Sequence, residues 1–324
     1  MSSDKPVKSA LICGITGQDG AYLAQYLLGQ GYRVTGTSRD AQVGRPNNLS
    51  RIGIHHDIQL LSMALNDFRS VIQVLDRTRP NEIYNLSGQS SVALSFEQPV
   101  ETLESLAVGT LNLLESIRFM KLDSRFYNAG SSECFGDTGE VLANEETPFR
   151  PRSPYAVAKA TAFWEVANYR EAYGLFACTG ILFNHESPLR PERFVTQKIV
   201  RGAARIAAGS GERLRLGNLD IGRDWGYAPE YVVAMWRMLQ QDTPDDFVIA
   251  TGTTNTLEAF VSTAFGHFGL DWKAHVDIDR GLLRPSDLKL SRADPSKAKA
   301  RLGWAAKSDM NAVIERMIEG LEGG

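Results

Sequence analysis

Apolar residues in the first half of the chain alternate between two spacings. Short apolar runs, typical of buried strands, are separated by stretches in which apolar residues recur at helical spacing. The expected strands are 10–13, 33–37, 58–61, 83–86, 126–129, 175–183 and 247–250, and the expected helices are 22–28, 68–77, 102–120 and 155–173. This alternation predicts a parallel sheet with helices on both faces. Right-handed crossovers then give a doubly wound α/β fold.

The pattern changes after Phe183. Residues 184–193 are polar and contain two prolines, which predicts a loop at the edge of the sheet. Helical spacing returns at 194–208 and 231–241, 214–218 predicts a short strand and turn, and a stripe from Met310 to Leu321 predicts a last helix, with Ser308 and Asp309 as candidate caps. We therefore expect two lobes. The first covers 1–183 and also receives a strand and a helix from about 225–265, and the second, over 184–324, is smaller and discontinuous.

Composition narrows the classes of partner. The chain has 324 residues, of which 43% are hydrophobic and 23% charged, as in ordinary globular proteins. A formal net charge of −3 gives no broad basic field for nucleic acid, and no apolar run is long enough for a membrane span. Cys13, Cys134 and Cys178 lack metal-ligand spacing, so we expect reduced thiols of a cytoplasmic protein. His185 and Glu186 have no further ligands at matching spacing, and we expect no metal.

A glycine-rich turn lies between the first expected strand and helix. Gly14, Gly17 and Gly20 have the spacing of a tight turn that brings backbone amides close to a pyrophosphate. This turn identifies the first lobe as a dinucleotide-binding (Rossmann) domain. Small residues after the fourth strand also permit a cofactor to approach closely. We expect cofactor contacts from Gly14, Thr16, Gly17, Gln18, Asp19, Gly20, Arg39, Leu86, Ser87, Tyr155 and Lys159.

Two neighbouring residues after the second strand favour different cofactors. Arg39 suits the 2′-phosphate of NADP, whereas Asp40 suits the free 2′-hydroxyl of NAD. We predict NADP and keep NAD as the alternative.

A candidate catalytic group surrounds Tyr155. Lys159 follows four residues later, so a helix places both side chains on one face, and a nearby ammonium is expected to lower the phenol pKa. Such a phenolate can take a proton from a sugar hydroxyl while a nicotinamide takes the hydride. Ser131 and Glu133 follow the preceding strand. Because alcohol oxidation needs one base, Glu133 suggests a second proton transfer at a neighbouring carbon.

Several longer strings resemble the extended short-chain dehydrogenase/reductase superfamily and, within it, the GDP-mannose 4,6-dehydratase family. They are Gly14–Gly20, Tyr84–Leu86 with Gln89 and Ser90, Ser131–Glu133, Pro151–Tyr155, Asn168–Glu171, Gly180–Arg190, Phe194–Thr196, Leu216–Asn218 and Arg223–Gly226. The resemblance implies that Ser131, Glu133, Tyr155 and Lys159 are catalytic. It implies a GDP-sugar substrate, a hydro-lyase reaction that is redox-neutral overall, and a homodimer or homotetramer. The expected substrate contacts are Ser90, Ser132, Asn184, Arg190, Lys198, Gly217, Asn218, Arg223 and Arg284.

The chain departs from the family pattern at several positions. The family typically has threonine at Ser131, a second arginine at Asp40, an acidic residue at Ala64 and a glycine in place of Pro191-Glu192. We expect GDP-mannose as substrate and keep GDP-D-glycero-D-manno-heptose as an alternative. A nucleotide-sugar epimerase or reductase would not need Glu133. A non-enzymatic nucleotide-sugar or dinucleotide sensor would need neither Tyr155 nor Lys159.

Overall fold

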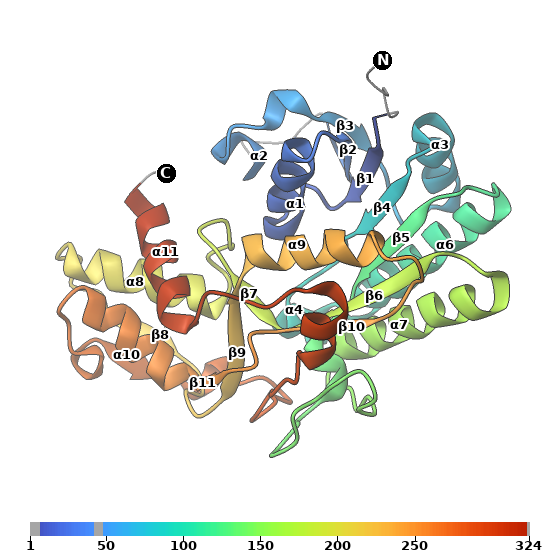
Figure 1. The fold of residues 1–324 in the computed structure, drawn as a ribbon. Helices are drawn as coiled ribbons and strands as arrows, with labels where there is room; N and C mark the ends of the chain where they lie inside the picture. Colours follow the sequence, from blue (N-terminus) through green and yellow to red (C-terminus); the bar gives the residue numbers. More distant parts are fainter. Residues whose placement is uncertain (1–6, 42–47, 323–324) are drawn as a thin grey trace.

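The larger part of the protein is built on one parallel sheet of seven strands. The computed structural model describes residues 7–41 and 48–322. The strand order is β10-β6-β5-β4-β1-β2-β3, and every pairing is parallel (Figure 1). The strands are β1 (Ser9–Cys13), β2 (Arg33–Ser38), β3 (Gln59–Ser62), β4 (Glu82–Asn85), β5 (Arg125–Ala129), β6 (Ala177–Leu182) and β10 (Phe247–Ile249). The predicted doubly wound fold is therefore confirmed, and all seven expected strands are present.

Helices cover both faces because the strands are apolar on both sides. In β1, Ala10 and Ile12 face a core that contains α1 (Gln18–Gly29) and α9 (Ala228–Leu239). The alternate residues, Leu11 and Cys13, face a core with α3 (Phe68–Thr78), α6 (Gly109–Phe119) and α7 (Pro154–Tyr173). This period-two division is what a parallel sheet buried on both faces requires.

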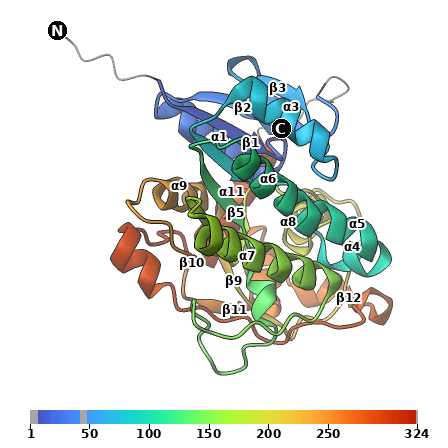
Figure 2. The same ribbon diagram turned by 90° about the vertical axis from the view of Figure 1, so that its right-hand side faces the viewer.

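The expected helix at 102–120 is three consecutive helical segments. These are α5 (Pro99–Leu103), the π-helical η2 (Glu104–Val108) and α6, which lie beside α7 on the side of the molecule that faces the viewer in Figure 2. Large apolar side chains are exposed along these helices, namely Val100, Leu103, Val108, Leu111, Phe119, Val157, Trp164 and Tyr173. The shorter segments are α2 (Asn48–Arg51), η1 (His55–Asp57), α4 (Val92–Glu97) and η3 (Ser132–Phe135).

The second lobe surrounds a separate core. It contains α8 (Val195–Ala207), α10 (Leu257–His267) and α11 (Met310–Glu322), whose apolar stripe is buried as expected. Its strands form the sheets β11-β9-β7 and β12-β8, with β7 (Asn184–Glu186), β8 (Leu214–Leu216), β9 (Gly222–Tyr227), β11 (Thr254–Thr256) and β12 (Val276–Ile278). The short turns η4 (Trp272–Ala274) and η5 (Arg280–Leu282) complete it. The π-helical η6 (Ala298–Leu302) follows in the chain but packs on α9 and β10 of the nucleotide lobe.

The prediction that residues 184–193 form a loop is wrong for the first three residues, which form a strand. Asn184–Glu186 form β7 and pair in parallel with Trp225–Tyr227 of β9. Polar residues form a strand here because distant β9 satisfies their backbone, and the local pattern does not reveal that partner.

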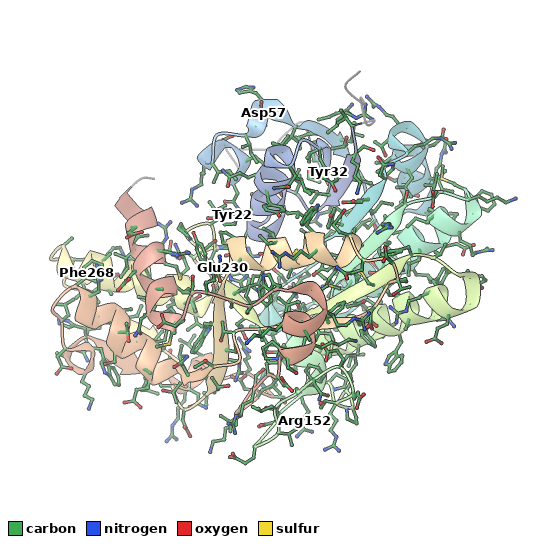
Figure 3. All side chains as sticks on the ribbon, viewed as in Figure 1. Tyr22, Tyr32, Asp57, Arg152, Glu230 and Phe268 are labelled. Atoms are coloured by element: carbon green, nitrogen blue, oxygen red, sulfur yellow. The ribbon has the colours of Figure 1, made fainter. Side chains whose placement is uncertain are left out.

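One carboxylate ties the last helix to the nucleotide lobe. Glu230, labelled in Figure 3 near the start of α9, accepts a hydrogen bond from Ser308 Oγ at 2.7 Å and one from the Lys307 amide at 2.8 Å. The α11 cap is Asp309, whose Oδ1 accepts from the Ala312 amide at 2.9 Å.

The three cysteines are buried free thiols. Among the helices of the described ranges, none combines the length and apolarity that a bilayer span requires.

Candidate active site

The site lies at the carboxyl ends of the central strands. The strand order reverses between β4 and β2 on either side of β1, and ligands of such sheets bind at this switch point. Two connected cavities open there, with volumes of about 720 and 440 Å³. Both are lined by Asp19, by residues 86–90, and by Arg190, Arg193 and Phe194. They therefore form one cleft between the two lobes.

The larger cavity has the shape that a dinucleotide needs at its glycine turn. Gly14 has φ of +81°, and a Cβ on it would lie 2.9 Å from the Leu86 carbonyl oxygen. A Cβ on Gly20 would lie 2.5 Å from the Gly14 carbonyl oxygen, so α1 can start close to the sheet only without a side chain. The first turn of α1 directs amide groups and the positive end of its dipole at this cavity. The residues present thus fit a pyrophosphate.

Nine of the expected cofactor residues line this larger cavity: Gly14, Thr16, Gly17, Gln18, Asp19, Gly20, Arg39, Leu86 and Ser87. The far wall holds Glu101, Glu104 and Ser105, which were not predicted from the sequence. Arg39 Nη1 lies 3.3 Å from Glu101 Oε1 across the cleft. Met63, Leu65 and Asn66 line the cleft on either side of Ala64. The wall residues lack a sequence signal because their segment reads as an ordinary helix.

Tyr155 and Lys159 lie in the first turns of α7 and line the smaller cavity. The helix begins sharply because Ser153 Oγ accepts the Ala156 amide at 3.1 Å and Pro154 occupies the first helical position. Lys159 is buried, and its Nζ donates to the Ala129 carbonyl oxygen at 2.6 Å. Burial lowers the pKa of Lys159 to about 8.

The expectation that Lys159 lowers the phenol pKa is not what this structure shows. Burial raises the pKa of Tyr155 above its usual value, and a hydrogen bond with Ser131 opposes that rise. Lys159 Nζ lies 5.9 Å from the Tyr155 ring centroid and is engaged with the Ala129 carbonyl. Desolvation of the phenolate therefore exceeds the lysine's influence.

Glu133 lies in η3, directly after β5. Its amide donates to Ser131 Oγ at 3.3 Å, which fixes the turn that brings the carboxylate to the smaller cavity. Burial raises the pKa of Glu133, Arg223 and Arg284 oppose this rise, and Asp287 adds to it. The structure thus brings Ser131, Glu133, Tyr155 and Lys159 to one cavity.

Cationic side chains line the side of this cavity formed by the second lobe. Arg223 on β9 is buried, and its Nη2 lies 3.1 Å from Asp287 Oδ1. Arg284 approaches the same oxygen at 3.4 Å. All nine expected substrate residues line this cavity: Ser90, Ser132, Asn184, Arg190, Lys198, Gly217, Asn218, Arg223 and Arg284. Asp287 and Phe194 also line it and were missed. The Arg190 guanidinium lies 3.7 Å from the Phe194 ring centroid.

His185 forms a buried ion pair with the cofactor turn. Its Nε2 lies 2.9 Å from Asp19 Oδ2 and its Nδ1 lies 2.7 Å from the Phe183 carbonyl oxygen. Burial lowers the pKa of His185, but the charge and hydrogen bond of Asp19 raise it above the usual value. Its neighbour Glu186 pairs with Arg190 at 3.1 Å. Throughout residues 7–41 and 48–322, no group of three or more His, Cys, Asp or Glu side chains could hold a metal.

Comparison with known proteins places this geometry in a family. The sequence model of the family described as GDP-mannose 4,6 dehydratase matches residues 11–317. GDP-mannose 4,6 dehydratase 1 of Arabidopsis thaliana is 47% identical over 97% of this chain and 90% of its own length. GDP-mannose 4,6-dehydratase of Sinorhizobium fredii is 45% identical over 96% of this chain and 95% of its own.

Solved structures agree on the fold. The dTDP-glucose 4,6-dehydratase of Bacillus anthracis, solved in complex with NAD, superposes with a TM-score of 0.85 at 19% identity, covering 98% of this chain and 97% of its own. This likeness extends over the nucleotide lobe and the second lobe alike. The match of the family model to residues 11–317 and the 45–47% identity of these relatives establish that the chain belongs to the GDP-mannose 4,6-dehydratase family.

Proposed function

We propose that the protein converts GDP-mannose to GDP-4-keto-6-deoxymannose, as a hydro-lyase with an internal oxidation and reduction. The observation that carries this proposal is Glu133, a carboxylate with raised pKa in the same cavity as Tyr155 and Lys159. Oxidation at C4 needs one proton acceptor, whereas elimination across C5 and C6 needs a second. The names of the relatives support the same substrate and reaction.

The glycine turn, Arg39, Leu86, Ser87 and Lys159 would hold a nicotinamide dinucleotide. When bound, its oxidised ring accepts a hydride from C4 and later returns it to C6, and the positive charge of the ring favours the phenolate of Tyr155.

Tyr155 Oη takes the proton of the C4 hydroxyl, with the Ser131 hydroxyl as a hydrogen-bond partner. The resulting C4 carbonyl acidifies the C5 hydrogen, and Glu133 removes it. The C6 hydroxyl leaves as water. Of the two protons released from O4 and C5, one leaves in that water and one returns to C5. The reaction therefore balances without an added reductant.

The environment of Glu133 suits this role. A carboxyl group with raised pKa is a stronger base when ionised and a competent donor when protonated. Both states are needed if it takes the C5 proton and passes a proton to the leaving hydroxyl. Arg190, Lys198, Arg223 and Arg284 supply the positive charge that a GDP diphosphate requires.

Three finer points belong to the same proposal. NADP remains our predicted cofactor because Arg39 lines the cleft, with NAD as the alternative favoured by Asp40.

We propose a homodimer or homotetramer that buries the exposed apolar side chains of α5, η2, α6 and α7. Trp164→Glu should then reduce the mass of the oligomer in sedimentation experiments. Buried free thiols support a reducing compartment, the cytoplasm.

Product mass tests the reaction and the substrate. Purified protein is incubated separately with GDP-mannose and with GDP-D-glycero-D-manno-heptose. The larger sugar is included because Pro191 and Glu192 depart from the family pattern, and Pro191 lines the cleft. We expect GDP-mannose to lose one water without net consumption of cofactor, and deuterium from solvent to enter C5. An unchanged mass would indicate an epimerase or a sensor, and net oxidation of added cofactor a reductase.

Glu133→Gln identifies the elimination base. We expect this variant to lose water elimination by about 100-fold or more, since positioned proton transfer contributes that much. The matched control is Glu145→Gln, because burial also raises the pKa of Glu145 but this residue does not line the cleft. Equal activity of Glu133→Gln and the wild type would refute the assignment.

A further inference from the structure

We infer that Glu101 determines cofactor specificity by weakening NADP binding relative to NAD. Glu101 lies on α5, and its carboxylate pairs with Arg39 across the larger cavity at 3.3 Å. Arg39 directly follows β2, where dinucleotide-binding folds place the 2′ position of the adenosine ribose. The carboxylate therefore occupies the side of Arg39 that a 2′-phosphate would use.

The two carboxylates at this end of the cleft oppose the attraction of Arg39 for a 2′-phosphate. A phosphate monoester carries roughly −1.5 to −2 charge at neutral pH. It would have to displace Glu101 from Arg39 and would also approach Glu104, which lines the same wall one helical turn later. A free 2′-hydroxyl is neutral and can donate a hydrogen bond to a carboxylate. Glu101 thus reduces the preference for NADP over NAD that Arg39 alone would give.

The size of this effect follows from exposure. The Arg39 and Glu101 side chains are 88% and 55% exposed, so water screens the pair. We expect discrimination of about tenfold, far below that of a buried polar contact. Because the guanidinium of Arg39 attracts phosphate, removing the charge of Glu101 should raise the affinity for the 2′-phosphate of NADP.

The experiment measures dissociation constants for NADPH and NADH by energy transfer from tryptophan to the nicotinamide. The proteins are the wild type, Glu101→Gln, Arg39→Ala, the double variant, and Glu97→Gln as control, since Glu97 on α4 does not line the cleft. Glu101→Gln should raise the affinity ratio of NADPH to NADH about tenfold. In the Arg39→Ala background the same change should have less than a threefold effect, and Glu97→Gln should leave the ratio unchanged.

The inference rests on the proposed function, because it assumes that the cleft holds a dinucleotide. If neither cofactor binds the wild type, both fall. If both bind and Glu101→Gln shifts the ratio less than twofold, the inference alone is refuted. An equally large shift without Arg39 would also refute it. Because both side chains are exposed, the variants should have the same thermal unfolding midpoint as the wild type, and a thermal scan measures this.

Discussion

The two ends of the cleft hold charged groups in opposite surroundings. At the sugar end, Lys159 and Arg223 are buried, and burial is the largest influence on the pKa values of Glu133, Tyr155 and Lys159. At the adenosine end, Arg39 and Glu101 are largely exposed. Exclusion of water destabilises the charged forms of the groups at the sugar end, so their pKa values shift and they can transfer protons. The exposed groups at the adenosine end stay hydrated, and they can only select among ligands by charge.

The largest expected effect would test whether burial at the sugar end supports proton transfer. Tyr155→Phe removes the phenol that accepts the C4 hydroxyl proton, and we expect turnover to fall by roughly 10²- to 10⁴-fold with KM changed less than threefold. The control is Tyr169→Phe on the same helix, whose hydroxyl donates to Glu115 at 2.8 Å outside the cleft. Product formation followed by mass measures both. Retention of more than a tenth of the activity by Tyr155→Phe would contradict the mechanism.

The sugar end was easier to predict from sequence than the adenosine end, for a physical reason. Tyr155 and Lys159 are linked by the helical repeat, and Ser131 and Glu133 by the end of one strand. The sheet was predictable because both faces of β1 are apolar. By contrast, Glu101 meets Arg39 only across the cleft, 62 residues away along the chain. The pairing of β7 with β9 and the raised pKa of Tyr155 likewise depend on distant groups that local patterns do not contain.

The pH dependence of cofactor binding is the second test. Burial lowers the pKa of Lys159 from 10.5 to about 8, so its ammonium is lost as pH rises through 8. We expect NADH and NADPH to bind more weakly above pH 8, by up to about tenfold per pH unit. Titrations from pH 6 to 10 would measure this. Lys159→Met should bind weakly without that dependence, whereas Lys299→Met, at an exposed site, should match the wild type.

Unfolding cannot account for such a loss. The unfolded chain holds the Lys159 proton up to about pH 10.5, while the folded protein releases it near 8. In this window the unfolded state binds more protons, so the contribution of Lys159 to stability rises with pH. If the thermal midpoint of the wild type fell in parallel with binding, but that of Lys159→Met did not, this account would be wrong.

Glu165 separates burial from catalysis. This half-buried carboxyl on α7 lies outside the cleft, and burial raises its pKa to about 7. The folded state then binds more protons between about pH 4.5 and 7, so stability falls as pH rises through this window. After allowance for solvent screening, Glu165→Gln should stabilise the fold at pH 8 by about 1 kcal/mol, or about 2 °C, and by nothing at pH 4. Melting curves against Glu146→Gln, an exposed neighbour of Glu145, measure this. The turnover of Glu165→Gln should equal that of the wild type, because this carboxyl does not reach the substrate. A 100-fold loss of turnover would show that a carboxyl outside the cleft also takes part in catalysis.

Salt gives the smallest effect and compares the two ends directly. Raising the ionic strength from about 0.01 M to about 1 M shortens the Debye length from about 30 Å to about 3 Å. The exposed pair should respond, so the tenfold difference in NADPH-to-NADH affinity ratio between Glu101→Gln and the wild type should shrink to about threefold. The pH midpoint assigned to buried Lys159 should move by less than about half a unit, because the protein keeps ions away from Nζ. Titrations at the two salt concentrations decide the matter. The comparison would be wrong if the affinity ratio were insensitive to salt while the pH midpoint of Lys159 shifted. In that case Glu101 would act through shape and not through charge, and Lys159 would be exposed to solvent.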